Sequence, residues 1–347
     1  MFQRPRKKTI TLLLLLIATL CLLFYTYDAN TNDSDSTSKP LHLATLTRQT
    51  RNSQESNQME SPNHLVSWSY LYPTFMISSE ERLANLRAEC QGRQASWSRL
   101  SVAEKRILAR QVIVDDEHKL LFCFIPKAGC ANWKRVFRVL DGRDKNVNHI
   151  AKFDHKDFKF LEDLPPRAIQ RRLDTYFKFV FVREPLSRLL SAYKNKLQNS
   201  TAIPGNGFVK RYVNEMTKHR RKHNSEKLSI TLSDFFLHIS KTKAAKLNDH
   251  WMPFKDLCQP CAMNYDFVGS LENIEQDSQK VFRLLNIQDK VVYPTRQHYY
   301  DDPETGNRLN DKLLSTVPRK LVQKALRKFE RDYVLFSYPY PGLRRRS

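Results

Sequence analysis

Two segments of the chain share a pattern that constrains the fold more than any other feature. In each, a buried strand runs through a short polar loop into an amphipathic helix. The first joins the apolar run Leu120–Ile125 to the loop Pro126–Cys130 and to a helix with apolar residues at 133, 136, 137 and 140. The second joins Tyr176–Val182 to Arg183-Glu184-Pro185 and to a helix with apolar residues at 186, 189, 190, 193 and 197. Such units build α/β folds, so we predict a central parallel sheet flanked by helices, with ligands at the carboxyl ends of the strands.

Other segments fit around these units. A further strand is expected at Tyr265–Gly269, and helices are expected at Glu80–Glu89, Leu232–Ile239, Asp277–Leu285 and Lys320–Phe329.

The N-terminus predicts a membrane anchor. Arg4–Lys8 is basic, and the uncharged apolar run Thr9–Tyr27 is long enough to span a bilayer as a helix. The alternative is a cleaved signal peptide, but the run exceeds a typical signal core and no small-x-small cleavage site follows. The positive-inside rule then gives a type II protein with a cytosolic tail at 1–8 and a transmembrane signal-anchor at 9–27.

We expect a polar, disordered stem to follow the anchor. Residues 28–100 form this luminal stem, and residues 101–347 form one catalytic domain. Asn32 and Asn199 stand in glycosylation sequons.

The charge of the chain indicates an anionic partner. Lys and Arg number 58 against 36 Asp and Glu, which gives a net charge of +22. An excess of this size favours binding to polyanions. A luminal location excludes nucleic acid, so anionic polysaccharides and lipid headgroups are the better candidates.

Each polar loop suits a phosphate group. In the first, Lys127 and the N-terminus of the following helix both attract an anion, although a tight turn with a solvated lysine would give the same sequence. The nucleoside-triphosphatase pattern GxxxxGK[ST] is absent, so a kinase or nucleotidase is disfavoured. In the second, Arg183 ends a strand and Ser191 lies off the apolar stripe of the helix, so that together they could hold a second phosphate.

The two segments resemble those of the Golgi carbohydrate sulfotransferases of the chondroitin, dermatan and HNK-1 group. That resemblance implies a P-loop-like sulfotransferase fold from about Val112 to Tyr340, with 3′-phosphoadenosine 5′-phosphosulfate as sulfate donor and no metal. It implies a 5′-phosphosulfate segment and a 3′-phosphate segment, in which Ser187 departs from the usual Glu. The implied donor-binding residues are Pro126, Lys127, Ala128, Gly129, Cys130, Ala131 and Asn132 in the first, and Arg183, Glu184, Pro185, Leu186, Ser187, Arg188, Leu189, Leu190 and Ser191 in the second.

Within the group the chain is most similar to the dermatan 4-O-sulfotransferases. The similar segments are Asp154-His155, His250–Pro253, Leu257–Ala262, Tyr265–Gly269 and Pro294–Gln297. The implied acceptor is the 4-hydroxyl of N-acetylgalactosamine in dermatan sulfate on a proteoglycan at the Golgi membrane, with His250, Trp251 and Arg296 as candidate acceptor-binding residues. Chondroitin or another sugar acceptor remains an alternative, as does a non-catalytic glycosaminoglycan-binding protein, and the sequence leaves an oligomer open.

The reaction needs a base to take the hydroxyl proton, and histidine suits this role near neutral pH. His155 lies between the two donor segments and resembles the histidine of uronyl 2-O-sulfotransferases, so we predict it as the base. Lys127 is the second predicted catalytic residue. His250 is the alternative base, although the adjacent Trp251 suggests a platform for the acceptor sugar.

Five cysteines follow the predicted anchor, so at least one is unpaired in a monomer. A luminal location favours disulfides, and we expect Cys130 in the first loop to be the free thiol. A zinc site at Cys258 and Cys261 lacks a second pair of ligands with suitable spacing.

Overall fold

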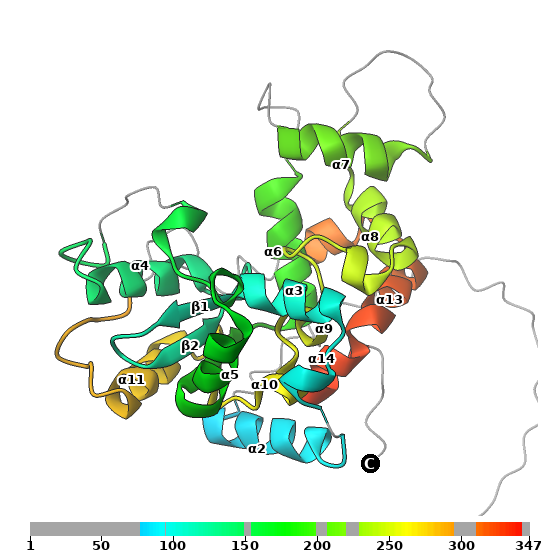
Figure 1. Ribbon diagram of the computed structural model, residues 1–347. Helices are drawn as coiled ribbons and strands as arrows, with labels where there is room; N and C mark the ends of the chain where they lie inside the picture. The colour runs from blue at the N-terminus through cyan, green and yellow to red at the C-terminus, as the bar shows by residue number, and fades with distance from the viewer. Residues whose placement is uncertain are drawn as a thin grey trace, which may run out of the picture. The chain divides into compact units, whose positions relative to one another are not determined.

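The computed structural model describes residues 77–93, 95–148, 154–198, 207–219, 229–294 and 310–341 (Figure 1). The chain divides into two compact units, Met1–Pro62 and Asn63–Ser347, and every described residue belongs to the second. The predicted anchor, the stem up to residue 76, and Asn32, Asn199 and Arg296 lie outside the described residues. Among the residues that are described, no helix is both long enough and apolar enough to cross a bilayer.

The sheet has four strands in sequence order. They are β1 (Val112–Asp115), β2 (Leu120–Cys123), β3 (Phe177–Val182) and β4 (Phe267–Ser270). β2 and β3 are parallel, with Cys123 opposite Val180, and β3 and β4 are parallel, with Val182 opposite Ser270. The three predicted strands are therefore confirmed, and the carboxyl ends of β2 and β3 lie at one edge of the sheet.

The prediction of a parallel sheet is wrong for its first strand. β1 pairs antiparallel to β2, with Val112 opposite Cys123, so the sheet is mixed. Only the short turn 116–119 separates the two strands, and a connection this short can join only antiparallel neighbours.

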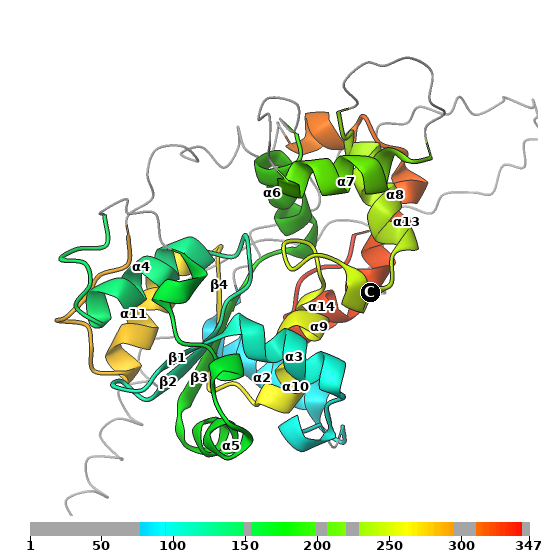
Figure 2. The same ribbon diagram turned by 45° about the horizontal axis from the view of Figure 1, so that its top comes forward.

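Helices cover both faces of the sheet (Figures 1 and 2). Phe122, Phe179 and Phe181 pack with α4 and α11 on one face, while Leu121, Val180 and their neighbours pack with α2, α3 and α5 on the other. This division follows from the alternation of side chains along a strand. The bounds of these helices are α2 Ser79–Cys90, α3 Val102–Gln111, α4 Cys130–Leu140, α5 Pro166–Thr175 and α11 Ile274–Leu284.

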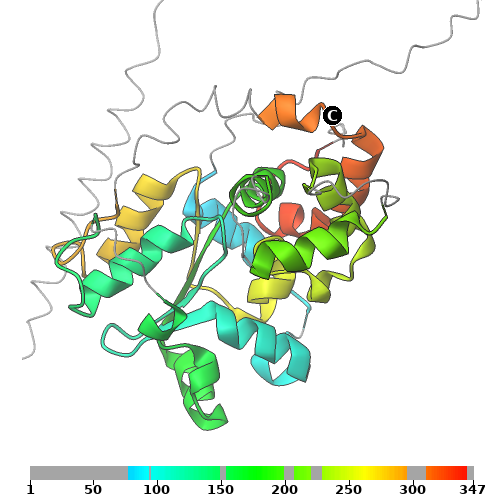
Figure 3. The ribbon, with the colours of Figure 1, turned by 90° about the horizontal axis from the view of Figure 1, so that it is seen from above.

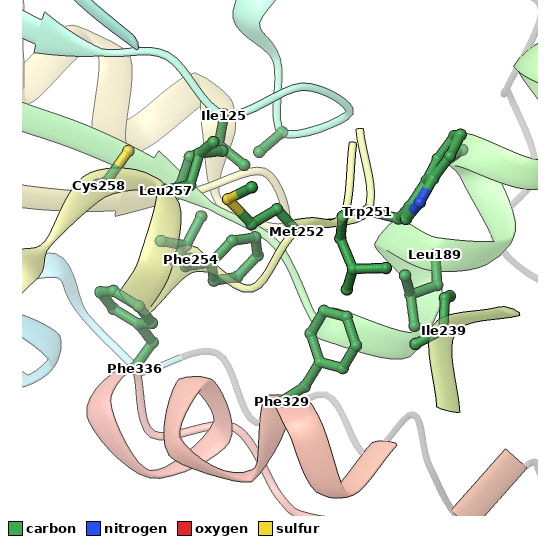
Figure 4. Packing of buried hydrophobic residues seen from close by; sticks show 14 of the residues in the cluster. Ile125, Leu189, Ile239, Trp251, Met252, Phe254, Leu257, Cys258, Phe329 and Phe336 are labelled. Carbon is green, nitrogen blue, oxygen red and sulfur yellow. The ribbon is translucent and has the colours of Figure 1, made fainter. Parts of the chain in front are cut away.

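The remaining helices form a second group beside the sheet. Figure 3 looks along α6, which lies between the sheet and α7, α8 and α13. Their bounds are α6 Pro185–Lys196, α7 Gly207–Thr217, α8 Leu232–Lys241, α9 Phe254–Cys258, α10 Pro260–Met263, α13 Arg319–Leu326 and α14 Glu330–Leu335. Short 3₁₀ helices lie at Trp97–Arg99, His155–Asp157, Leu161–Asp163, Ala244–Lys246 and Arg327–Phe329. The buried side chains of Leu189, Trp251, Phe254, Phe329 and Phe336 join this group to the segment between α8 and α9 (Figure 4).

Helix α2 lies within the segment that we expected to be stem, yet it is part of the folded domain. A capping box between Ser78 and Glu81 begins the helix, and Arg82 and Leu86 are buried against the domain. Cys90 at its end forms a disulfide with Cys261. The folded part therefore begins before residue 101.

A second disulfide joins Cys123, the last residue of β2, to Cys258, the last residue of α9. Cys130 is the free cysteine among the described residues, as predicted. The expectation of disulfides at Cys258 and Cys261 is confirmed, and each pairs with a distant cysteine.

Candidate active site

The first loop carries backbone conformations that few side chains adopt. Lys127 and Gly129 both have positive φ, at 71° and 83°. A left-handed residue other than glycine costs roughly 1–2 kcal/mol, and such strain is concentrated at functional sites. The loop delivers the chain to α4, whose N-terminus has no side-chain cap and so presents backbone N–H groups suited to an anion.

Close packing explains why a glycine stands at position 129 of the first loop. A Cβ on Gly129 would lie 2.9 Å from the hydroxyl of Tyr293 and 3.5 Å from Leu271. The Tyr293 ring also packs edge-on against Trp133 of α4, with ring centroids 5.5 Å apart. The chain that leads toward Arg296 therefore passes directly beside the first loop.

The second loop offers few side chains to a ligand. Its seven side chains from Glu184 to Leu190 are buried, whereas Arg183 and Ser191 are partly exposed. Glu184 caps α6 by accepting hydrogen bonds from the backbone N–H groups of Leu186 at 3.0 Å and Ser187 at 2.5 Å. The sulfate donor can thus contact the side chains of Arg183 and Ser191. We predicted that the residues between them also bind the sulfate donor, and this can apply only to their backbone groups.

The two loops touch each other. The Arg183 guanidinium donates from Nη1 to the carbonyl oxygen of Lys127 at 3.2 Å. This contact follows from the pairing of β2 with β3, which ends both strands at one edge. In the first loop, Pro126 and Ala128 are buried, and in the first turn of α4 Ala131 is exposed and Asn132 half-buried.

Arg188 fastens a third segment to this edge. Its fully buried guanidinium donates to the carbonyl oxygens of Pro126 at 2.9 Å, Met252 at 2.7 Å and Asp249 at 2.7 Å. With its donors engaged on backbone oxygens, Arg188 positions the first loop and the 249–252 segment relative to α6.

Two cations, Lys127 and Arg183, lie at this edge of the sheet. Among the described residues, neither Lys127 nor Arg183 forms an ion pair with Asp or Glu. Burial lowers the pKa of Lys127, and the nearby charges of Arg183 and Lys196 lower it further. Burial and the charge of Arg183 likewise lower the pKa of Lys194, whose amino group donates to Asn310 Oδ1 at 2.7 Å. Half-buried cations that repel one another indicate a site for an anion.

Lys134 adds a cation that the sequence reasoning did not single out. Its ammonium lies over the ring of Phe124, 4.1 Å from the centroid, and 5.4 Å from that of Phe158. Burial lowers its pKa, although the charge of Asp249 acts in the opposite direction. Its position one helical turn after Cys130 was the signal available in the sequence, since residues four apart share a helix face.

His155, the predicted base, lies in an exposed 3₁₀ turn. Its ring stacks on Phe160 with centroids 3.9 Å apart, and its Nε2 lies 3.7 Å from Glu162 Oε1. Phe160 in turn contacts the ring of Phe124, which lies two residues before the first loop. The neighbouring Asp154 carboxylate accepts from the backbone of His155, so Glu162 is the acid that faces the ring.

His250, the alternative base, lies in the segment held by Arg188. Its Nδ1 is 2.8 Å from Asn248 Oδ1 and 3.0 Å from Asp249 Oδ1. Burial acts to raise the pKa of Asp249, but the hydrogen bond to His250 and the charges of His250 and Arg188 outweigh it and lower that pKa. Asn248 and Asp249 therefore orient the His250 ring, and Arg188 connects the segment of His250 to the first loop.

Trp251 cannot stack on a sugar, so its predicted role as an acceptor platform is wrong. The side chain is fully buried, and it packs between Tyr212 and Phe235 with ring centroids 5.0 and 5.4 Å away. The sequence pattern His250-Trp251 gave no information on burial.

Cys130 begins α4 inside the first loop. Burial raises the pKa of its thiol even though Lys134 and Lys127 lie nearby. A thiol in this environment stays protonated and is a poor nucleophile. Within the described ranges, no group of three or more His, Cys, Asp and Glu residues could hold a metal ion.

Comparison with known proteins places this site in a family. The model of the sulfotransferase family matches residues 110–339, which include both loops. Carbohydrate sulfotransferase 14 of Danio rerio is 39% identical over 273 residues, covering 77% of this chain and 73% of the relative. Carbohydrate sulfotransferase 14 of Homo sapiens is 38% identical over 77% and 71%, and carbohydrate sulfotransferase 8 of Mus musculus is 28% identical over 85% and 71%. No solved structure matches. The match over both strand–loop–helix units and the relatives agree with the resemblance seen in the motifs: the chain belongs to the sulfotransferase family.

Proposed function

We propose that the protein transfers sulfate from 3′-phosphoadenosine 5′-phosphosulfate to the 4-hydroxyl of N-acetylgalactosamine in dermatan sulfate. One observation carries the donor part of the proposal: at the ends of two parallel strands the Arg183 side chain contacts the Lys127 backbone, and neither side chain pairs with a carboxylate of the described residues. The acceptor part rests on the resemblance to dermatan 4-O-sulfotransferases. We place the reaction in the Golgi lumen, with the chain anchored as a type II membrane protein.

The cations have separate tasks. The donor supplies an activated sulfate group, and Lys127 would hold the 5′-phosphosulfate and stabilise the negative charge that develops on the leaving oxygen. Arg183 and Ser191 would hold the 3′-phosphate, because the planar guanidinium forms strong charge-assisted hydrogen bonds with phosphate oxygens.

A histidine would remove the proton of the acceptor hydroxyl. His155 is our predicted base, and the tie through Arg188 to the first loop supports His250 as the alternative. His155→Ala and His250→Ala should both bind donor normally. Loss of the true base should lower turnover about a hundredfold or more, and near-normal turnover of His155→Ala beside an inactive His250→Ala would assign the role to His250.

The decisive experiment supplies the full-length protein with donor carrying radioactive sulfate and with desulfated dermatan or chondroitin. Disaccharide analysis of the product should place the label on the 4-position of N-acetylgalactosamine, with dermatan preferred. Preferential labelling of chondroitin or of a terminal sugar would move the protein to another acceptor within the family. Binding of both polymers without any labelling would instead indicate a non-catalytic glycosaminoglycan-binding protein.

A further inference from the structure

Two consecutive residues of the C-terminal helix α14 reach opposite sides of the candidate site. Asp332 and Tyr333 are both buried, with side chains at most 1% exposed. Neither belongs to the two donor segments: Asp332 contacts Phe254, 78 residues away, and Tyr333 contacts Glu184, 149 residues away. Their contacts differ, because adjacent residues on a helix point in different directions.

Tyr333 contacts the second donor loop. Its hydroxyl donates to Glu184 Oε1 at 2.7 Å, and the same carboxylate oxygen accepts from the backbone N–H of Leu186. Tyr338 acts on the same turn through Glu272, which accepts from the Tyr338 hydroxyl at 2.9 Å and from the backbone N–H of Glu184 at 2.9 Å. The turn that carries Arg183 into α6 is thus held from behind by the C-terminal segment.

Asp332 contacts the segment that carries His250. Its carboxylate accepts from the backbone N–H groups of Phe254 at 2.7 Å and Lys255 at 2.9 Å, which begin α9. Arg188 holds the carbonyl oxygens of Asp249 and Met252 in the same segment, and its guanidinium lies 4.8 Å from the centroid of the Phe254 ring. The buried Arg188 guanidinium and the buried Asp332 carboxyl group therefore fix both ends of the stretch from residue 249 to 255, and Phe336 packs on Phe254 beside them (Figure 4).

We propose that Tyr333 is a positioning residue for the donor side of the site and Asp332 a positioning residue for the acceptor side. This inference rests on the proposed function, since it names donor and acceptor sides. Tyr333 acts through Glu184 on the turn that presents Arg183, while Asp332 acts through the backbone of α9 on the segment of His250.

The two roles predict different kinetic signatures from isosteric changes on neighbouring residues. Tyr333→Phe should weaken binding of adenosine 3′,5′-bisphosphate about tenfold, the scale expected when a buried carboxylate loses one hydroxyl donor, with turnover at saturating donor close to normal. Asp332→Asn should leave that affinity within about twofold, and it should lower turnover or raise the acceptor KM about tenfold. Calorimetric binding of the bisphosphate and initial rates with both substrates varied would measure the two effects.

Tyr265→Phe is the matched control. Tyr265 is as deeply buried as Tyr333, but its hydroxyl donates to the carbonyl oxygen of Cys258 at 2.9 Å. Donor affinity should be unchanged in this variant. If Asp332→Asn is not recovered folded, Asp332→Glu is measured instead, because it keeps the carboxyl group but displaces it. The same kinetic result is expected for this variant.

The inference is overturned if Tyr333→Phe binds the bisphosphate like the unmodified protein, or if Tyr265→Phe weakens binding equally. It is also overturned if the Asp332 variant loses donor affinity in proportion to turnover. A failure of the proposed function looks different, since the unmodified protein would then not bind the bisphosphate at all.

Discussion

At Gly129 a single hydrogen side chain lets the first loop turn and lets Tyr293 approach it. The residue has a φ of 83°, and a Cβ would lie 2.9 Å from the Tyr293 hydroxyl. Gly142 has a φ of 73°, but no atom lies within 4 Å of the position that a Cβ would take. A substitution at Gly142 therefore carries the cost of the backbone conformation without the cost of a close contact.

We therefore expect Gly129→Ala to weaken binding of adenosine 3′,5′-bisphosphate at least tenfold, because the loop must shift away from Tyr293. Gly142→Ala has a similar conformational cost of about 1 kcal/mol and should leave binding unchanged. Calorimetry on both variants measures the difference. Equal affinities would mean that the loop tolerates the displacement and that its observed geometry is not required for the donor.

Arg183 is the residue through which the 3′-phosphate proposal can be tested. Arg183→Ala should bind nucleotides with and without the 3′-phosphate equally, and Arg183→Lys should restore little of the preference, since Lys lacks the planar fork. Competition between adenosine 3′,5′-bisphosphate and adenosine 5′-monophosphate measures this preference. A preference retained in the alanine variant would remove Arg183 from the site.

At the level of elements, local pattern predicted the two strand–loop–helix units well, because each is a run of apolar residues with its own periodicity. The same method did not predict β1, and it left α2 in the stem. The association of α2 with the domain depends on a disulfide to Cys261, 171 residues away, and local pattern carries no signal for that contact.

Removal of either disulfide should lower the stability of the protein, but only one removal should also weaken binding of the bisphosphate. Each closes a loop of more than 130 residues, so either loss should lower the free energy of unfolding by about 5 kcal/mol or less. The double variant Cys123→Ser with Cys258→Ser should also weaken bisphosphate binding, since this bond ties the end of β2 to α9. The variant Cys90→Ser with Cys261→Ser is its control, because that bond ties α2 to α10. Unchanged binding in both would show that the Cys123–Cys258 bond is not needed to hold the loop in place.

At the level of the whole molecule, the site depends on contacts between residues far apart in the sequence, which local sequence patterns do not predict. Arg188 reaches carbonyl groups 62 and 64 residues away in opposite directions along the chain. The motif identified Arg188 as part of the donor segment, but its burial and its three backbone partners became apparent only from the fold. The same holds for Asp332, which lies beyond the helix predicted at Lys320–Phe329 and was not among the predicted site residues.

Burial of Asp332 should make stability depend on pH. Burial raises the pKa of Asp332 to about 7, although its hydrogen bonds from Lys255 and Phe254 and the charge of Arg188 oppose the rise. The folded protein then binds more protons than the unfolded chain between about pH 4 and pH 7, so this group's contribution to stability is lost as pH rises through that range. Between pH 5 and pH 7, Asp332→Asn should flatten the change by up to about 3 kcal/mol. Urea unfolding of both proteins at pH 5 and pH 7 measures it, and parallel changes would contradict the assignment.

The nesting of the two disulfides has a consequence for how the chain is made. Cys90–Cys261 encloses Cys123–Cys258, so neither Cys90 nor Cys123 has its partner until almost three quarters of the chain has been synthesised. During that time Cys90, Cys123 and Cys130 are together in the growing polypeptide, in a compartment that must be oxidising for the native bonds to form. Premature bonds among these three are available to the nascent chain, and each would have to be exchanged before the edge of β2 could dock on α9. The native pairing at the end of β2 therefore requires that any such early bond be exchanged after Cys258 and Cys261 have been added to the chain.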